Sequence, residues 1–128
     1  MKLLKNFTME QGFNDKYRDR TKRLAVGVIK LLRKENKSDE YRILHKQLVR
    51  SITSVGANFR ASCRSRSEKD YLNKLAITIE ELDESQYWIE LLIELGELTL
   101  SDVKEMMDEI SSVLAVLTKL HYNKKGGL

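Results

Sequence analysis

The sequence predicts an all-α protein folded as one up-down-up-down antiparallel four-helix bundle. The chain contains no proline, so no residue forbids the helical hydrogen-bond ladder. Apolar residues recur at three- and four-residue steps in four segments, which is the periodicity of amphipathic helices. Only short polar connections separate these segments, and short connections favour antiparallel neighbours. We therefore expect residues 1–128 to form a single domain, with residues 1–13 and 123–128 as flexible ends.

The first two helices are predicted in the basic half of the chain. The first runs from about Asn14 to Glu35, and Asn14 suits the position of an N-cap. Its apolar positions are Tyr17, Leu24, Ala25, Val28, Ile29 and Leu32. After the polar sequence NKSD, the second helix is predicted from about Asp39 to Arg64. Its apolar stripe consists of Tyr41, Leu44, Leu48, Ile52, Val55 and Phe59.

The third and fourth helices are bounded by capping signals. Ser67 followed by Asp70 resembles a capping box and opens the third helix, which runs to about Gly96 as a C-cap glycine. Its predicted core residues are Tyr71, Leu72, Leu75, Ile79, Leu82, Ile89 and Ile93. Thr99 or Ser101 caps the fourth helix. The apolar positions of that helix are Val103, Met106, Met107, Ile110, Val113, Leu114 and Leu117.

The charge of the chain is divided unevenly along its length. Residues 1–74 hold 19 Lys and Arg against 8 Asp and Glu, whereas residues 75–128 hold 4 against 11, so the two parts carry +11 and −7. This asymmetry favours either a basic surface for nucleic acid or complementary faces that pair within or between subunits. A single cysteine and the lack of any signal-like or membrane-spanning apolar run predict a cytoplasmic protein that does not enter a membrane.

Two helix faces turned away from the predicted core favour a subunit interface. The outer face of the third helix is apolar and acidic, and it consists of Ile77, Glu81, Glu84, Trp88, Leu91, Leu92 and Leu95. The outer face of the second helix is small and basic, and it includes Ile43, Arg50, Ser54, Ala57, Ala61 and Arg64. Two different but complementary patches make a head-to-tail contact that closes into a ring. We expect Arg50 or Arg64 of one subunit to face Glu81 or Glu84 of the next. The alternative is that Trp88 packs against a neighbouring helix or the amino-terminal tail.

Two segments resemble a known family. The sequences SVGANFR (54–60) and YLNKLAITIEELDESQYWIELL (71–92) resemble the signature of the 23S rRNA intervening-sequence proteins. The resemblance implies a four-helix bundle that assembles as a homopentamer. It also implies a fold similar to the accessory variability protein of diversity-generating retroelements, which binds nucleic acid and a reverse transcriptase. The family has no established reaction. Where its motif leads us to expect an acidic residue and then alanine, this chain has Ala61 and Ser62.

Residues that could support catalysis or metal binding are few. His45 and His121 lack the Glu three residues earlier that a di-iron bundle requires, and the acidic run EELDE (80–84) diverges around a helix. Cys63 lies near Arg60, Arg64 and Arg66, so it is either a nucleophilic thiol or a small core thiol. We expect no catalytic residue, no metal and no cofactor, and therefore a non-enzymatic protein.

The remaining candidates form a basic cluster. Lys and Arg side chains neutralise phosphates and give an affinity that falls steeply with salt. The interpretation is a ring-forming binding or scaffold protein that holds structured RNA or DNA, with or without a protein partner. The alternative is a protein-binding assembly factor whose basic residues serve the subunit contacts. The candidate nucleic-acid-binding residues are Lys16, Arg18, Arg20, Lys22, Arg23, Arg60, Arg66 and Lys69.

Overall fold

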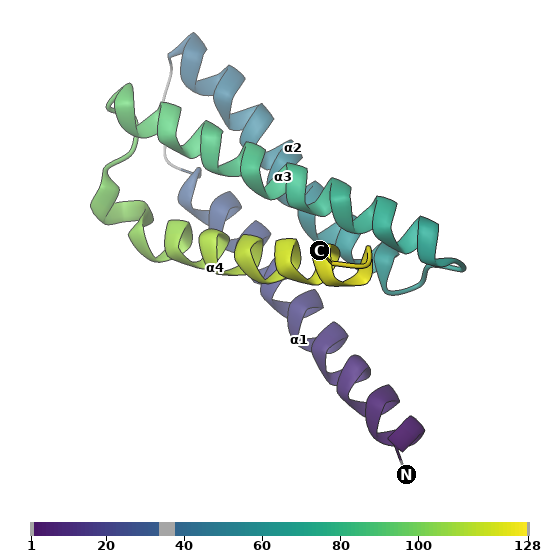
Figure 1. Ribbon diagram of the computed structural model, residues 1–128. Coiled ribbons are helices and arrows are strands. Elements are labelled where there is room, and N and C mark those ends of the chain that lie inside the picture. Colours follow the sequence, from purple (N-terminus) through teal and green to yellow (C-terminus); the bar gives the residue numbers. More distant parts are fainter. Residues whose placement is uncertain (1, 34–37, 128) are drawn as a thin grey trace.

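The protein is an antiparallel bundle of four helices, shown as a computed structural model in Figure 1. The structure describes residues 2–33 and 38–127, with side chains from Thr8 onward. The helices are α1 (Lys2–Leu31), α2 (Asp39–Ser62), α3 (Glu68–Glu94) and α4 (Leu100–Lys124). Successive helices run in opposite directions, and each packs on its two neighbours around the bundle, so that α1 and α3 lie diagonally apart. The predicted fold class is confirmed.

The helix ends follow the capping signals of the sequence. The Ser67 hydroxyl accepts a hydrogen bond from the Asp70 amide at 3.0 Å, as the predicted capping box requires. Thr99, one of the two predicted caps of α4, accepts from the Asp102 amide at 3.2 Å. Gly96 has a φ of +76°, which lies in the left-handed region that glycine adopts at low cost. These predicted boundaries of α3 and α4 are confirmed.

The first helix begins at Lys2 and not at Asn14 as predicted, and residues 2–13 are helical where we expected a flexible end. The segment contains no proline, and its one glycine, Gly12, is not enough to stop the helix. Phe13 also anchors it, because its ring stacks on Tyr17 with centroids 4.4 Å apart. In Figure 1 the first turns of α1 extend beyond the other three helices.

The carboxyl-terminal ends of the second and fourth helices each differ from the prediction by two residues. The second helix ends at Ser62, two residues before the predicted Arg64. The fourth continues to Lys124, so residues 123 and 124 are helical within the predicted carboxyl-terminal tail. The predicted end of the first helix at Glu35 lies outside the described residues. The hydrogen bonds of the last turn determine the residue at which a helix ends, and the spacing of apolar residues does not show this residue.

The apolar stripes predicted for the four helices meet in one core. Among the fully buried side chains are Val28, Leu48, Leu82 and Ile110, one from each helix. Three assignments were wrong: Ile29 and Leu72, predicted in the core, are only half-buried and do not pack against it, and Leu92, predicted on the outer face of α3, is fully buried. Leu92 lies three residues after the buried Ile89 and therefore continues the inward stripe of the helix.

Small residues set how closely α2 approaches its neighbours. The buried hydroxyl oxygens of Ser51 and Ser85 lie 2.8 Å apart, so α2 and α3 are in close contact at this level. On the other side of α2, a Cβ added to Gly56 would lie 3.7 Å from the backbone of Thr21 in α1. The backbones of α1 and α2 are therefore close at Gly56, beside the surface described next.

Candidate functional site

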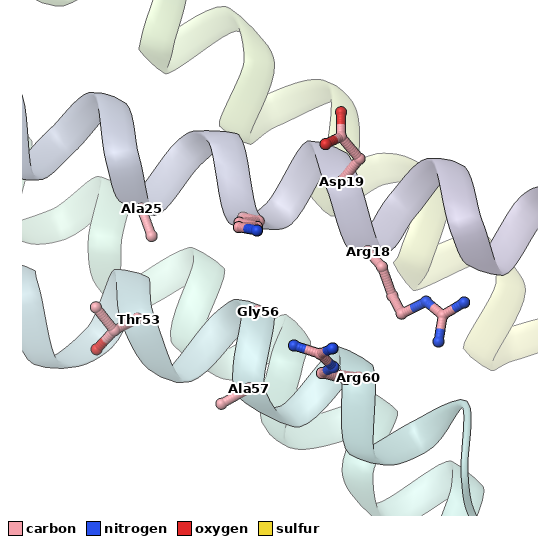
Figure 2. A pocket seen from close by; sticks show the side chains of 8 residues that line it. Arg18, Asp19, Ala25, Thr53, Gly56, Ala57 and Arg60 are labelled. Atoms are coloured by element: carbon pink, nitrogen blue, oxygen red, sulfur yellow. The ribbon is translucent and has the colours of Figure 1, made fainter.

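The crossing of α1 and α2 leaves a groove of about 420 Å³ on the surface (Figure 2). Its floor is lined by small side chains, because no large residue stands where the two helices come together. Basic side chains stand on both walls. The lining residues are Arg18, Asp19, Lys22 and Ala25 from α1, and Thr53, Gly56, Ala57 and Arg60 from α2.

The charge of this groove is positive. In Figure 2 the Arg60 side chain points into the space between the two helices, and Arg18 extends toward α2. The carboxylate of Asp19 points away from α2, and it lies 3.4 Å from Arg23 on its own helix. Within the described part of the chain, neither Lys22 nor Arg60 has a salt-bridge partner, so both are available to an anion.

A second hollow, of about 520 Å³, lies on the same helix toward its amino-terminal end. It is lined by Arg42, His45, Lys46, Val49 and Arg50. The spacing of three and four residues continues from these positions into the α2 residues of the groove, so both hollows share one outward face. No Asp or Glu occurs between Glu40 and Glu68.

We call this surface the α2 basic face, and it consists of Arg42, Lys46, Arg50 and Arg60 together with Arg18 and Lys22 of α1. The candidate list drawn from the sequence missed Arg42, His45 and Lys46. The signal that could have found them is the run of 27 residues without an acid, from 41 to 67, in which basic residues recur on the side of the helix opposite the core stripe.

Arg50 forms its ion pairs within one chain, whereas the sequence analysis expects them between subunits. One guanidinium nitrogen lies 3.1 Å from Glu81 and another bonds Glu84. Trp88 donates its indole N–H to the same Glu84 at 3.2 Å. The physical reason is the register of α2 on α3, which places Arg50 beside these carboxylates. Arg64, in the turn after α2, pairs with neither of them.

Burial and hydrogen bonding shift the pKa values of Glu81 and Arg50. Partial burial raises the pKa of the Glu81 carboxyl above its ordinary value, and the positive charge of Arg50 opposes that change. The hydrogen bond to Glu84 raises the pKa of Arg50. At neutral pH the Arg50 guanidinium is therefore held at the boundary of α2 and α3, with half of its side chain still exposed.

The two faces predicted to meet across subunits adjoin each other in one chain. Ala57 is exposed, Ser54 and Ala61 are half-buried, and all three lie on the outward side of α2. On α3, Glu81, Glu84, Trp88 and Leu91 are half-buried, and Trp88 packs against the core. The alternative for Trp88, contact with its own bundle, therefore accounts for part of its surface. Ile77 and Leu95 remain exposed, as does Ile43 on α2.

Residues 15–119 match the family described as 23S rRNA-intervening sequence protein. The chain belongs to this family. It is also similar to the crystal structure of a protein of unknown function from the S23 ribosomal protein family of Bacteroides thetaiotaomicron VPI-5482, with a TM-score of 0.74 and 31% identity over 81% of this chain and 96% of that chain. None of the curated proteins matches the chain.

The intervening-sequence family match begins after the first turns of α1, and it includes both hollows of the α2 basic face. Most of the other basic candidates lie exposed around that face. Lys16, Lys22 and Arg23 are exposed on α1, while Arg66 and Lys69 are exposed beside the turn that joins α2 to α3.

Arg20 differs from the other basic candidates of this family member, because it connects α1 to α4. Its guanidinium donates to both carboxylate oxygens of Glu109, one of them at 2.9 Å. It also donates to the Tyr17 hydroxyl at 2.9 Å and lies 4.8 Å from the centre of that ring. We therefore assign Arg20 to the packing of α1 on α4 and leave it out of the candidate nucleic-acid surface.

This pair predicts a pH-dependent contribution to stability. The hydrogen bond from Arg20 lowers the pKa of Glu109 below its ordinary value, so the pair stabilises the fold above the unfolded-state pKa and loses that effect as the pH falls through the folded-state pKa. Replacing Glu109 with glutamine is expected to cost about 1 kcal/mol at pH 7 and much less at pH 3. Urea unfolding at both pH values measures this. Glu105→Gln, an exposed neighbour on α4, is the control, and an equal cost for Glu109→Gln at the two pH values would contradict the assignment.

Cys63 is half-buried, and burial raises the pKa of its thiol. A raised pKa keeps the thiol protonated and unreactive, which favours the small core thiol over the nucleophile. In the described part of the chain, no three His, Cys, Asp or Glu side chains gather to hold a metal ion. The described helices also include none that is long and apolar enough to cross a membrane.

Proposed function

We propose that this chain is a non-enzymatic protein that binds structured RNA or DNA along the α2 basic face. The observation that carries the proposal is the acid-free outward side of α2, which joins the groove between α1 and α2 to the second hollow. An RNA ligand is consistent with the description of the family, which names 23S rRNA.

The chemistry of this face is suited to phosphates. Lys22, Lys46 and Arg60 have no salt-bridge partner among the residues that the structure describes, so an anion need not displace an internal carboxylate from them. Each phosphate that they neutralise releases condensed counterions from the nucleic acid. The logarithm of the binding constant should therefore fall linearly with the logarithm of the salt concentration, with little dependence on sequence.

A charge-reversal pair in the groove tests the proposal. Lys22→Glu with Arg60→Glu should reduce the affinity for a structured RNA by about tenfold or more at low salt and make its salt dependence shallower. The matched control is Lys119→Glu with Lys124→Glu, which changes the net charge equally on exposed residues of α4. Fluorescence anisotropy titrations at two salt concentrations measure both. Equal losses in the two variants, or no binding by the unaltered protein, would contradict the proposal.

A second candidate function is assembly into a ring of identical subunits, which the family resemblance implies is a homopentamer. The observation that favours it is the exposed apolar surface where α2 adjoins α3, with Ile43 and Leu95 exposed to 61% and 56%. In this alternative the basic residues serve contacts to protein, and the chain is an assembly factor. Two results together would favour this alternative. The unaltered protein would bind no nucleic acid, and the groove variant Lys22→Glu with Arg60→Glu would dissociate the assembly.

A further inference from the structure

We infer that the α2 basic face holds the double-helical part of a structured nucleic acid and contacts its two backbones with two separate cationic clusters. This inference rests on the proposed function. It adds the form of the ligand and the way in which the face divides its contacts.

The positive charges of the face fall into two groups. The first is formed by Arg42, Lys46 and Arg50 around the amino-terminal hollow of α2. In it Arg42 also pairs with Asp39, and Arg50 pairs with Glu81 and Glu84, so Lys46 is the cation without an ion pair among the described residues. The second is formed by Arg18, Lys22 and Arg60 in the groove between α1 and α2, where Arg18 also pairs with Asp15 of its own helix. Fourteen residues of one uninterrupted helix separate Lys46 from Arg60, which places their Cα atoms about 21 Å apart along the helix axis.

Between Lys46 and Arg60 the outward side of α2 carries one charged residue, Arg50, and its other side chains are small or uncharged. These are Val49, Thr53, Gly56 and Ala57, and the last three form the floor of the groove between α1 and α2. A double helix presents two phosphate rows with a groove between them, about 12 Å wide for the major groove of B-form DNA. Long Arg and Lys side chains can reach from the two clusters to both rows, and the small side chains of α2 between the clusters then face the groove of the duplex.

The aromatic residues argue against a single-stranded ligand. Proteins that bind single strands stack the bases on exposed aromatic side chains. The aromatic side chains that lie beneath this face, Tyr17, Tyr41 and Phe59, are buried in the core. The exposed Tyr87 and Tyr122 belong to α3 and α4. The one aromatic ring that lines the two hollows is the half-buried imidazole of His45, so the face offers several cations for a backbone and little surface on which unpaired bases could stack.

The position of α2 also limits what it can read. Because α1 and α3 flank it on both sides, α2 cannot enter a groove as an isolated recognition helix does. Its contacts are confined to the phosphates, which position a protein without reading sequence.

A comparison of duplex and single strand tests this inference. The probes are a 20-base-pair RNA duplex, the corresponding DNA duplex, and one strand of each chosen to have no internal pairing, at equal phosphate concentration. We expect the duplexes to bind about tenfold or more tightly than the strands at the same salt concentration. Equal or tighter binding of the single strands would overturn the inference and leave the proposed function standing. No binding of any probe at low salt would overturn both.

Variants of the two clusters test the division of contacts. Arg42→Glu with Lys46→Glu and Lys22→Glu with Arg60→Glu should each weaken duplex binding by about tenfold and each lower the salt slope, because each removes contacts to one backbone. Lys119→Glu with Lys124→Glu should change neither. If only one of the two cluster variants weakens duplex binding relative to this control, a single cluster holds the ligand and the two-backbone arrangement is overturned. Circular dichroism melting confirms that every variant is folded.

Discussion

Replacing Phe59 with alanine is expected to lower the free energy of unfolding by about 3–5 kcal/mol. The Phe59 side chain is 1% exposed. Its ring lies edge-on to Phe13 and tilted against Tyr17, both in α1, with centroid distances of 6.4 Å in each case. Removing the ring opens a cavity where α2 meets Phe13 and Tyr17 of α1. The next turns of α1 carry Arg18 and Lys22, which form one wall of the groove.

Urea denaturation followed by circular dichroism measures this cost, and an exposed apolar residue supplies the control. Leu100→Ala removes a side chain that is 61% exposed at the start of α4, so its cost should stay within about 0.5 kcal/mol. A Phe59→Ala variant no less stable than Leu100→Ala would show that the aromatic cluster does not hold α1 against α2. Because the groove depends on that contact, the Phe59 variant should also bind nucleic acid more weakly.

The fold was predictable because the core stripes of all four helices are strong and no residue interrupts them. Leu92 was misplaced for a simple reason: Leu91, Leu92 and Leu95 make one side of α3 apolar almost continuously, and helical spacing alone does not show where the buried part ends. The early start of α1 was missed because Asn14 is a good capping residue, and only the contact of Phe13 with Tyr17 shows that the helix continues through it.

The candidate site was predictable in composition but not in partners. The sequence shows that Arg50 and Arg20 are basic and lie on helices. Which carboxylates they meet depends on the register of α2 on α3 and of α1 on α4, and this register is set by packing across the bundle. The α2 basic face could not be predicted without knowing how α1 packs on α2. Arg18 and Lys22 belong to this face only because α1 crosses α2 near Gly56.

Ring assembly through the outer surface of α2 and α3 predicts a large change in molecular mass. If it occurs, the unaltered chain should run well above its monomer mass of 14.9 kDa in light scattering. Trp88 is unsuitable for disrupting it, because this side chain also packs against the core and its removal would destabilise the bundle. Ile77 and Leu95 are exposed, and a lysine at either position leaves the core intact.

We expect Ile77→Lys with Leu95→Lys to convert the assembly into a folded monomer, because two charges would have to be buried without partners in each contact. Lysine also suits position 95, where positive charge near a helix carboxyl terminus is favourable, so the monomer itself should not lose stability. Tyr122→Lys, at an exposed position near the end of α4, is the control and should leave the mass unchanged. An unaltered chain that runs as a monomer would contradict ring assembly. The exposed apolar surface of α2 and α3 would then be left for contact with a different protein, and the α2 basic face of a single subunit would have to bind the nucleic acid.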